Sequence, residues 1–301
     1  MNLRAQLIGR GAIVGLTVLS LLPEPLLLAV ARAWGAIGPL LQPARARLAR
    51  VNLARVYEYR DRVAPSDHAL THGTRQIFEH HLRFYIESAR APRHARTIIA
   101  TRVRLEDERA VAAAFAPSAG ASIFLAAHFG AIELPGSILA DRSGRTPIAP
   151  MEEIDNEVLQ SWMLRVRGAG LGLRIIPAKG AAEAMSAELA DGGIVGMVGD
   201  RTVVGGGVPV RLFGHLAKLP ISPALLAVES GAALYVAAVV REPRGAYTGY
   251  IRSVAIPTEG DRMARTRGAL AGIAAAFEEL IMKAPEQWWT LFYPIWDDLR
   301  A

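Results

Sequence analysis

Hydrophobic and polar positions change their pattern twice along this chain of 301 residues. Two long apolar stretches come first, at residues 7–22 and 26–41, and Pro23 and Pro25 separate them. Each is shorter than the ~20 residues that span a bilayer as a helix. We therefore expect two helices that lie in or dip into a membrane interface, anchored by Arg4, Arg10, Arg32 and Trp34.

Three other interpretations of this segment stay open. A signal peptide would explain Arg4 and Arg10 before an apolar core, and residues 29–31 resemble a cleavage site. A single tilted span could also run through the prolines. The third interpretation is a buried helical hairpin that belongs to a soluble core.

Arginines dominate the next stretch. They alternate with aliphatic residues at helical spacing, which predicts a basic amphipathic helix suited to anionic lipid headgroups; the alternative is a solvated helix face. These arginines are Arg45, Arg47, Arg50, Arg55, Arg60 and Arg62. Residues 74–90 predict a second amphipathic helix, and residues 91–104, with Pro92, predict a linker.

From about residue 103 onward, short apolar runs alternate with helical patterns. This alternation predicts an α/β fold with a mostly parallel central sheet flanked by helices. Expected strands are residues 122–127, 147–150, 174–177, 193–198, 208–212, 232–240 and, as an edge strand, 247–254. Expected helices are residues 106–116, 131–140, 156–168, 180–189, 223–230 and 263–284. We expect residues 1–104 to dock on the membrane and to pack on an α/β core of residues 105–301, within one structural domain.

Composition narrows the chemistry. The chain has no cysteine, which excludes disulfides, thiolate catalysis and cysteine-ligated zinc. The net charge of +6 comes almost wholly from arginine, a good phosphate ligand, since only Lys179, Lys218 and Lys283 are lysines. No nucleic-acid module is recognisable, so the basic balance favours an anionic membrane surface over nucleic acid. Gly73 interrupts the spacing of His68, His72, His80 and His81, and we expect no metal site.

The most informative position for function is His128. It ends the apolar strand of residues 122–127, and Gly130 supplies the turn into the following helix. Glu133 lies one turn away, so the pair could act as an oriented base that deprotonates an alcohol. The alternative is a core histidine with Glu133 merely favourable at a helix N-terminus. Asp200 ends another buried strand and could replace Glu133 as the partner of His128 if the two strands lie side by side.

Other enzyme classes lack their motifs. The chain contains no G-x-S-x-G nucleophile turn, so a lipase or thioesterase of the α/β-hydrolase type has no nucleophile. It contains neither a G-x-G-x-x-G fingerprint after a first strand nor a Walker A lysine for a nucleotide. The glycines at 205–207 precede a strand rather than a helix, which is typical of a flexible loop; a phosphate cradle is the less favoured alternative.

Four motifs in sequence order carry a family resemblance. His128-x4-Glu133 resembles the H(x4)D/E motif of glycerolipid-type acyltransferases. The whole chain resembles the bacterial lipid A biosynthesis (lauroyl/myristoyl) acyltransferase family, which includes phosphatidylinositol mannoside acyltransferases. The other motifs are Arg50-Val-Asn52-Leu53, Gly199-Asp200-Arg201 with Val208-Pro-Val-Arg-Leu-Phe213-Gly214, and Pro285-Glu286-Gln287-Trp288-Trp289.

Two departures from the family pattern stand out. The family usually has Asn-Trp where this chain has Ala131-Ile132. Its lipid A enzymes usually carry His-Arg-Arg after P-E-Q-W, whereas this chain has Leu291-Phe-Tyr-Pro-Ile-Trp296. The second departure is nearer the mannoside branch.

The resemblance implies a membrane-associated O-acyltransferase, peripheral or monotopic, on the cytoplasmic face of the plasma (inner) membrane. Its donor would be acyl-CoA or an acyl carrier protein, its acceptor a hydroxyl of a glycolipid or phospholipid, and it would need no cofactor. His128 would be the base and Glu133 its orienting partner, with amides around Gly130 and Ala131 as oxyanion donors. Arg201 would hold a phosphate, with Asp200, Arg165 and Arg167 as further substrate-binding candidates. The alternative is a non-catalytic lipid-binding or scaffolding relative.

Overall fold

A seven-stranded sheet forms the centre of the computed structural model, which describes residues 3–116, 119–168, 170–202 and 207–299. The strand order is β1-β9-β8-β2-β5-β3-β4, and neighbouring strands of this sheet are parallel except β8 and β9, which are antiparallel. The predicted α/β class with a mostly parallel sheet is therefore confirmed. The strands are β1 (Val103–Leu105), β2 (Ser122–Ala126), β3 (Ile148–Met151), β4 (Arg174–Pro177), β5 (Ile194–Val198), β8 (Ala233–Arg241) and β9 (Tyr247–Val254).

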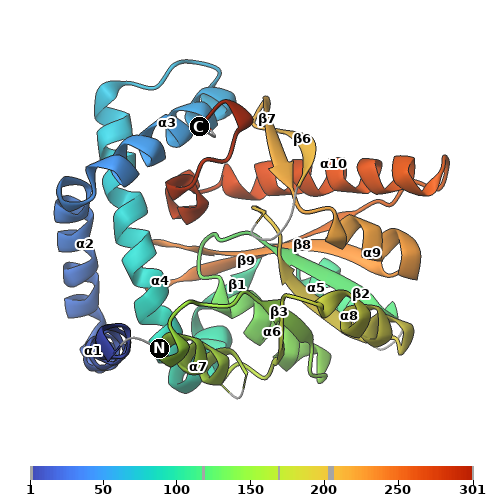
Figure 1. Ribbon diagram of the computed structural model, residues 1–301, viewed down its shortest axis with the longest axis horizontal. Helices are drawn as coiled ribbons and strands as arrows, with labels where there is room; N and C mark the ends of the chain where they lie inside the picture. The colour runs from blue at the N-terminus through green and yellow to red at the C-terminus, as the bar shows by residue number, and fades with distance from the viewer. Residues whose placement is uncertain (1–2, 117–118, 169, 203–206, 300–301) are drawn as a thin grey trace.

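Helices cover both faces of this sheet (Figure 1). Helices α9 and α10 lie on one face, and α5 and α6 lie on the other. Buried strand residues such as Ile123, Leu125, Val195 and Val236 form the main core with α9 and α10, whereas Phe124 packs with α5 and α6 on the other face. The helices of this part are α5 (Glu108–Ala114), α6 (Glu133–Ser143), α7 (Glu157–Arg167), α8 (Ala181–Ala190), α9 (Ser222–Ser230) and α10 (Arg262–Ile281).

Two predictions about strands need correction. Strand β9 is not an edge strand, because the three-residue β1 pairs with it in parallel, with Val103 opposite Tyr247. A further strand, β7 (His215–Leu219), was not predicted; it forms a separate antiparallel hairpin with β6 (Val208–Leu212). Phe213, at φ 51°, lies in the turn of this hairpin. The expected glycine loop falls on residues 205–207, of which only Gly207 lies within the described residues.

The predicted linker at residues 91–104 is wrong. Helix α4 (Asp67–Arg102) runs through Pro92 for 36 residues, about 54 Å. Ala91, Ala95 and Ile99 follow one another at helical spacing and pack against α6. This packing outweighs the ~3 kcal/mol that a proline costs inside a helix.

The N-terminal segment forms α1 (Leu3–Ser20), α2 (Glu24–Leu41) and α3 (Pro43–Asp61). Helix α2 lies along α4 through a buried stripe of Leu27, Ala31, Gly35 and Gly38 (Figure 1). A Cβ at Gly38 would lie 2.6 Å from the ring of Phe78, so the small residue permits this close approach. Helix α2 therefore reaches the α/β part through α4, whereas α1 also contacts α7 and α3 contacts the C-terminal segment.

The opposite side of these helices is apolar and exposed. By length and composition, α2 is long and apolar enough to cross a membrane, whereas the apolar part of α1 is shorter. Large apolar side chains that are exposed here are Leu7, Ile8, Val14, Val18, Leu21, Leu26, Ile37, Leu40 and Leu41. This exposure contradicts the interpretation as a buried hairpin of a soluble core.

Several arginines of α3 are engaged within the protein. Arg50 pairs with Asp67, Arg55 with Asp298 and Arg60 with Asp61. The predicted basic helix exists, but these three charges already have carboxylate partners.

Candidate active site

His128 and Asp200 meet at the carboxyl edge of the sheet. Strands β2 and β5 are parallel neighbours in register, with Ala126 opposite Val198. Each functional residue follows two positions after its strand, so the side chains converge where open α/β sheets bind ligands. His128 Nδ1 lies 2.7 Å from Asp200 Oδ1. The Asp200 side chain is 1% exposed and that of His128 is 13% exposed.

The second oxygen of Asp200 is held from the C-terminal segment. Trp288 Nε1 donates to Oδ2 at 2.7 Å, and the Thr290 hydroxyl donates to it at 2.6 Å. Burial alone would raise the pKa of Asp200, but the charge of His128 and the hydrogen bonds from His128, Thr290 and Trp288 outweigh it and lower this pKa to about 2. An ionised carboxylate only accepts, so Nδ1–H of His128 donates and Nε2 is the basic nitrogen.

Glu133 takes a different partner from the one expected. Its carboxylate accepts hydrogen bonds from Arg167, with Nη2 at 3.0 Å, and from the Ser88 hydroxyl at 3.0 Å. The contact with His128 belongs to Asp200, the alternative that the sequence left open. The reason is local: Glu133 begins α6, which packs on α4, and Ser88 belongs to α4.

The expected oxyanion donors are also engaged within the fold. The amide of Gly130 donates to the carbonyl of Gln287 at 3.2 Å, and that of Ala131 donates to the carbonyl of Val239 at 2.8 Å. Gly130 has φ +60°, and a Cβ there would collide with the Val239 carbonyl oxygen. Gly130 therefore permits the turn that positions His128, and its amide is already engaged in a hydrogen bond within the fold.

The Pro285–Gln287 helix and the residues after it brace the histidine loop. The amide of Trp289 donates to the carbonyl of His128 at 3.1 Å. The side-chain amide of Gln287 bonds both backbone groups of Arg241, at 2.9 and 2.8 Å. Sequence reasoning did not identify Trp288 and Thr290 as site residues, although Trp288 belongs to the P-E-Q-W motif that signalled the family.

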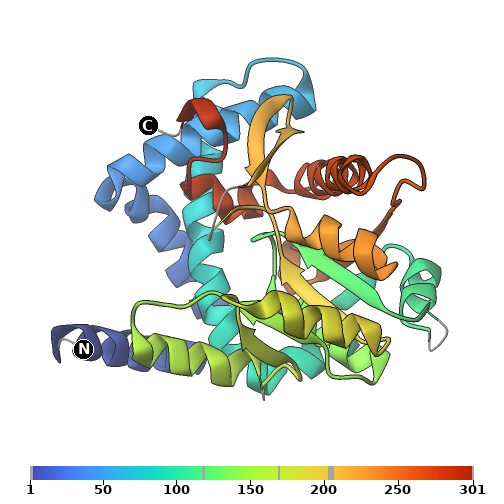
Figure 2. The ribbon, with the colours of Figure 1, turned by 45° about the vertical axis from the view of Figure 1, so that its right-hand side comes forward.

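Asn52 connects the first motif to this segment. It is fully buried, and its Nδ2 donates to the carbonyls of Leu291 and Tyr293 at 2.7 and 2.8 Å. The red C-terminal segment accordingly lies beside the blue α3 in both views (Figures 1 and 2). Motifs more than 230 residues apart in sequence therefore support the same loop.

The three candidate arginines differ in position. Arg201 stacks on Tyr293, with the guanidinium carbon 4.7 Å from the ring centroid, and pairs with Glu152 at 3.2 Å. Its Nε is buried without a hydrogen-bond partner among the described residues. Arg167 lines the cleft beside His128 but is paired with Glu133. Arg165 is exposed and lines neither the cleft beside His128 nor the apolar pocket between the sheet and helices α5 and α6.

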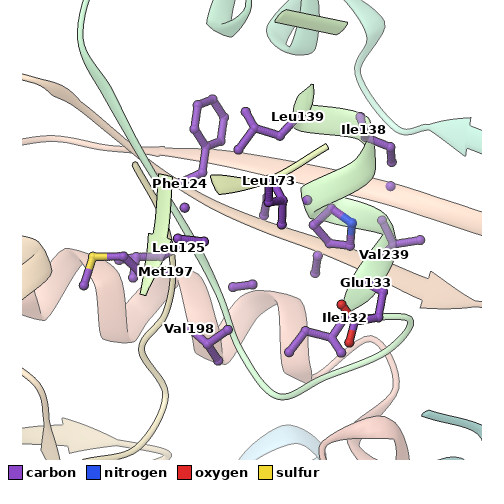
Figure 3. Close-up of a pocket in the computed structure, with 18 of the residues that line it drawn as sticks. Phe124, Leu125, Ile132, Glu133, Ile138, Leu139, Leu173, Met197, Val198 and Val239 are labelled. Carbon is purple, nitrogen blue, oxygen red and sulfur yellow. The ribbon is translucent and has the colours of Figure 1, made fainter. Parts of the chain in front are cut away.

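Two cavities share lining residues, and His128 lines the larger of them. The larger is a cleft of about 920 Å³ that His128, Trp289 and Arg201 line together with helices α1, α7 and α8. The second, an apolar pocket of about 130 Å³, lies between the sheet and helices α5 and α6. Figure 3 shows this apolar pocket, with Phe124 and Leu125 of β2, Met197 and Val198 of β5, and Glu133 beside Ile132. Met151, Met197 and Val198 line both cavities, which are therefore adjacent.

Comparison with known proteins identifies the family to which this chain belongs. Two similar proteins are the phosphatidylinositol mannoside acyltransferases of Mycobacterium tuberculosis strains H37Rv and CDC 1551, each 32% identical over 190 residues. Each match covers 61% of this chain and 57% of the relative, so the chain spans little more than half of their length. The model of the bacterial lipid A biosynthesis acyltransferase family matches residues 8–296, a stretch that includes His128, Asp200 and Trp288. The chain belongs to the bacterial lipid A biosynthesis acyltransferase family.

Proposed function

We propose that this protein is a membrane-associated O-acyltransferase that moves a fatty acyl chain from a thioester to a hydroxyl of a glycolipid or phospholipid. The observation that carries the proposal is the hydrogen bond between His128 and the buried carboxylate of Asp200 at the edge of a large cleft. This arrangement leaves one imidazole nitrogen free to accept a proton. It is the arrangement that activates an alcohol near neutral pH.

The reaction follows from that geometry. His128 Nε2 takes the proton of the acceptor hydroxyl as its oxygen attacks the thioester carbonyl. The tetrahedral intermediate then expels the thiolate, and the imidazolium returns its proton to that sulfur. Asp200 fixes the tautomer of the neutral imidazole and stabilises the imidazolium that forms, as the buried aspartate does in a serine-protease triad. Direct transfer is the economical course because no internal nucleophile is apparent in the chain.

The apolar pocket suits the acyl chain of the donor. Phe124, Ile138, Leu139 and Leu173 line it, and the polar side chains among its described lining residues are the paired Glu133 and Arg167 and the hydroxyl of Tyr250. Burying a chain there gains about 0.8 kcal/mol per CH₂. The ion pair lies beside both the pocket and the imidazole loop, so Glu133 is a positioning residue that holds α6 and Arg167 in place.

Arg201 suits a phosphate of one of the two substrates. It lines the cleft and also a smaller pocket with Lys218 and Thr290. A thioester donor, acyl-CoA or an acyl carrier protein, carries phosphate in its phosphopantetheine arm, and a phospholipid carries a phosphodiester. A guanidinium binds either in a planar, bidentate way that lysine cannot reproduce.

The membrane assignment rests on the exposed apolar side of α1 and α2. Leu26, Leu40 and Leu41 are each at least half exposed, and Arg10 and Arg32 on the same two helices are exposed as well. Apolar side chains flanked by arginines suit the boundary between headgroups and acyl chains of an anionic leaflet. We place the protein on the cytoplasmic face of the plasma membrane. The mannosylated phosphatidylinositol in the names of the relatives is the acceptor class to test first.

A non-catalytic lipid-binding relative is the rival, motivated by Ala131-Ile132 in place of the usual Asn-Trp. Replacing His128 by alanine separates the two. Purified protein would be incubated with palmitoyl-CoA and mannosylated phosphatidylinositol in anionic vesicles, and the products measured by lipid mass spectrometry. We expect kcat to fall by roughly 10²–10⁴-fold in His128→Ala. His72→Ala, an exposed histidine of α4, is the matched control. Undiminished turnover in folded His128→Ala protein would refute the proposed base.

A further inference from the structure

Helix α1 has an inner side that meets the protein and an outer side that is exposed. One face packs on the protein: Gly9 is buried, and a Cβ there would collide with Asn156 at the start of α7. Both ribbon views show α1 beside α7 (Figures 1 and 2). A second face points outward and is apolar, since Leu7, Val14 and Val18 are each more than half exposed.

Farther along the helix, the inner side of α1 forms a wall of the reaction cleft. Ala12, Gly15, Leu16 and Leu19 all line the cleft that His128 and Trp289 line. Their spacing of three, four and seven residues puts them on one side of a helix. The outward apolar face and the cleft are therefore separated only by the width of one helix, about 10 Å.

The opposite walls of the cleft are largely apolar as well. Leu159, Trp162 and Met163 come from α7, and Ala181 and Met185 come from α8. Both substrates of an acyl transfer to a lipid bring hydrocarbon chains, so two apolar compartments are needed. No α1 residue that the structure describes lines the pocket between the sheet and α6. The cleft beside α1 is the compartment that adjoins the exposed apolar helices.

We propose that α1 is the wall along which a hydrocarbon chain of the lipid acceptor lies, so that the acceptor reaches His128 from the bilayer rather than from water. The inference rests on the proposed acyl transfer and adds where the acceptor binds. In this arrangement the outward face of α1 contacts the lipid leaflet while its cleft face contacts the chain of the acceptor. The acceptor hydroxyl then meets Nε2 of His128 without its chains leaving an apolar environment.

Two glycines of α1 make a matched test. A Cβ at Gly15 meets no atom within 4 Å, and the same is true at Gly11. Both glycines are exposed, but Gly15 lines the cleft and Gly11 does not. A tryptophan at either position fits the backbone and is a better helix former than glycine. Gly15→Trp narrows the cleft beside the acceptor chain, and Gly11→Trp adds the same ring one turn earlier, at a position that does not line the cleft.

The first measurement needs no turnover. Wild-type protein and both variants would be bound to anionic vesicles that contain phosphatidylinositol with a photoactivatable diazirine near the end of one acyl chain. After irradiation, the adducts would be mapped by peptide mass spectrometry without any acyl donor. We expect adducts on α7 and α8 in the wild type and in Gly11→Trp. In Gly15→Trp we expect them to fall at least roughly 5-fold, while adducts on the exposed side of α2 stay equal in all three proteins.

The second measurement is kinetic. With palmitoyl-CoA as donor and mannosylated phosphatidylinositol in vesicles as acceptor, Gly15→Trp should raise the acceptor KM by roughly 10-fold, and more than it raises the donor KM. Adducts confined to α2 in the wild type, or α7 and α8 adducts that Gly15→Trp leaves unchanged, would overturn the inference. A larger rise in the donor KM would also overturn it by assigning this wall to the donor. Absence of transfer in the wild type would count against the proposed function alone, because the adducts form without turnover.

Discussion

Trp288 donates its indole N–H to the one carboxylate oxygen of Asp200 that His128 does not use, at 2.7 Å. The carboxylate is thereby held between the imidazole on one side and the C-terminal segment on the other. Together with the Thr290 hydroxyl, these groups give the carboxylate three hydrogen bonds, and the Asp200 side chain is only 1% exposed. Asp200 can therefore stay ionised in the interior and hold His128 in a single tautomer.

Removing the charge of Asp200 should reverse that tautomer preference. In Asp200→Asn, the side-chain amide can donate to Nδ1 and leave the proton on Nε2, where a base is needed. We expect kcat to fall by up to ~10⁴-fold, as for the equivalent change in a serine-protease triad. Initial rates of thiol release with saturating acceptor measure it.

Glu133→Gln is the comparison variant for the same assay. In the wild type, the Glu133 carboxylate binds Arg167 and Ser88 rather than His128. We therefore expect Glu133→Gln to have a lower melting temperature than the wild type and a smaller loss of kcat than Asp200→Asn. Equal losses of kcat in the two variants, at matched stability, would argue against Asp200 as the sole partner of the base.

Arg201→Lys should raise KM more than it lowers stability. Lysine keeps the charge but loses the planar fork, at a cost of about 1.5–3 kcal/mol for one charged hydrogen bond, or roughly 10- to 150-fold in KM. The exposed Arg165→Lys serves as the control. A lower melting temperature with an unchanged KM would instead make Arg201 structural, through Glu152 and Tyr293.

Asn52→Ala should destabilise the fold and weaken the site together. The change leaves the buried carbonyls of Leu291 and Tyr293 without their donor, which we expect to cost about 2–4 kcal/mol. Urea unfolding measures the loss, and Arg47→Ala, an exposed change in the same helix, is the control. An unfolding midpoint equal to that of the wild type would show that the segment does not depend on Asn52.

His81 should make stability depend on pH. Burial, with a smaller effect of Arg45, lowers the pKa of His81 to about 3. An unfolded histidine binds a proton near pH 6.5, so unfolding takes up a proton between about pH 6.5 and 3. The stability from the neutral ring is therefore complete above pH 6.5 and falls by about 1.4 kcal/mol per pH unit below it.

His81→Phe tests this dependence. The ring lies among Tyr85, Trp289 and Phe292, so phenylalanine fits its surroundings without a titratable group. We expect urea unfolding between pH 7 and 5 to show a shallower loss of stability in His81→Phe than in the wild type. Parallel curves for the two proteins would refute the assignment.

Leu26→Asp and Leu40→Asp should weaken membrane binding without unfolding the protein. Both side chains are exposed, at 53% and 78%, on the side of α2 that faces away from α4. A vesicle flotation assay measures binding, and circular dichroism checks the fold. Unchanged flotation of the double variant would remove α2 from the membrane interface.

The sequence predicts most of the α/β part because its elements have local signals. Buried strands such as β2 and β5 are uninterrupted apolar runs, and polar residues mark their ends. The helix through Pro92 escaped prediction because its stability comes from packing of Ala91 and Ile99 rather than from local propensity. Strand β1 has only three residues, too few for a pattern.

Within the site, the partner of His128 likewise could not be predicted from local sequence signals. Glu133 is near in sequence, but the turn at Gly130 and the start of α6 bring its carboxylate to Arg167 and Ser88. Asp200 is 72 residues away, and it reaches His128 because β5 lies next to β2 in the sheet. Strand adjacency depends on topology, so residue spacing left two partners open and only the structure distinguishes their contacts.

The order in which the site is assembled during synthesis follows from where its parts lie in the chain. The apolar helices α1 and α2 leave the ribosome first, whereas Trp288 and Thr290, which hold Asp200, come 88 and 90 residues after it. If the protein docks on the membrane as proposed, a nascent chain can therefore reach the bilayer long before a carboxylate is fixed beside His128. In this proposed sequence of events, acyl transfer begins only after the C-terminal segment has folded back onto α3.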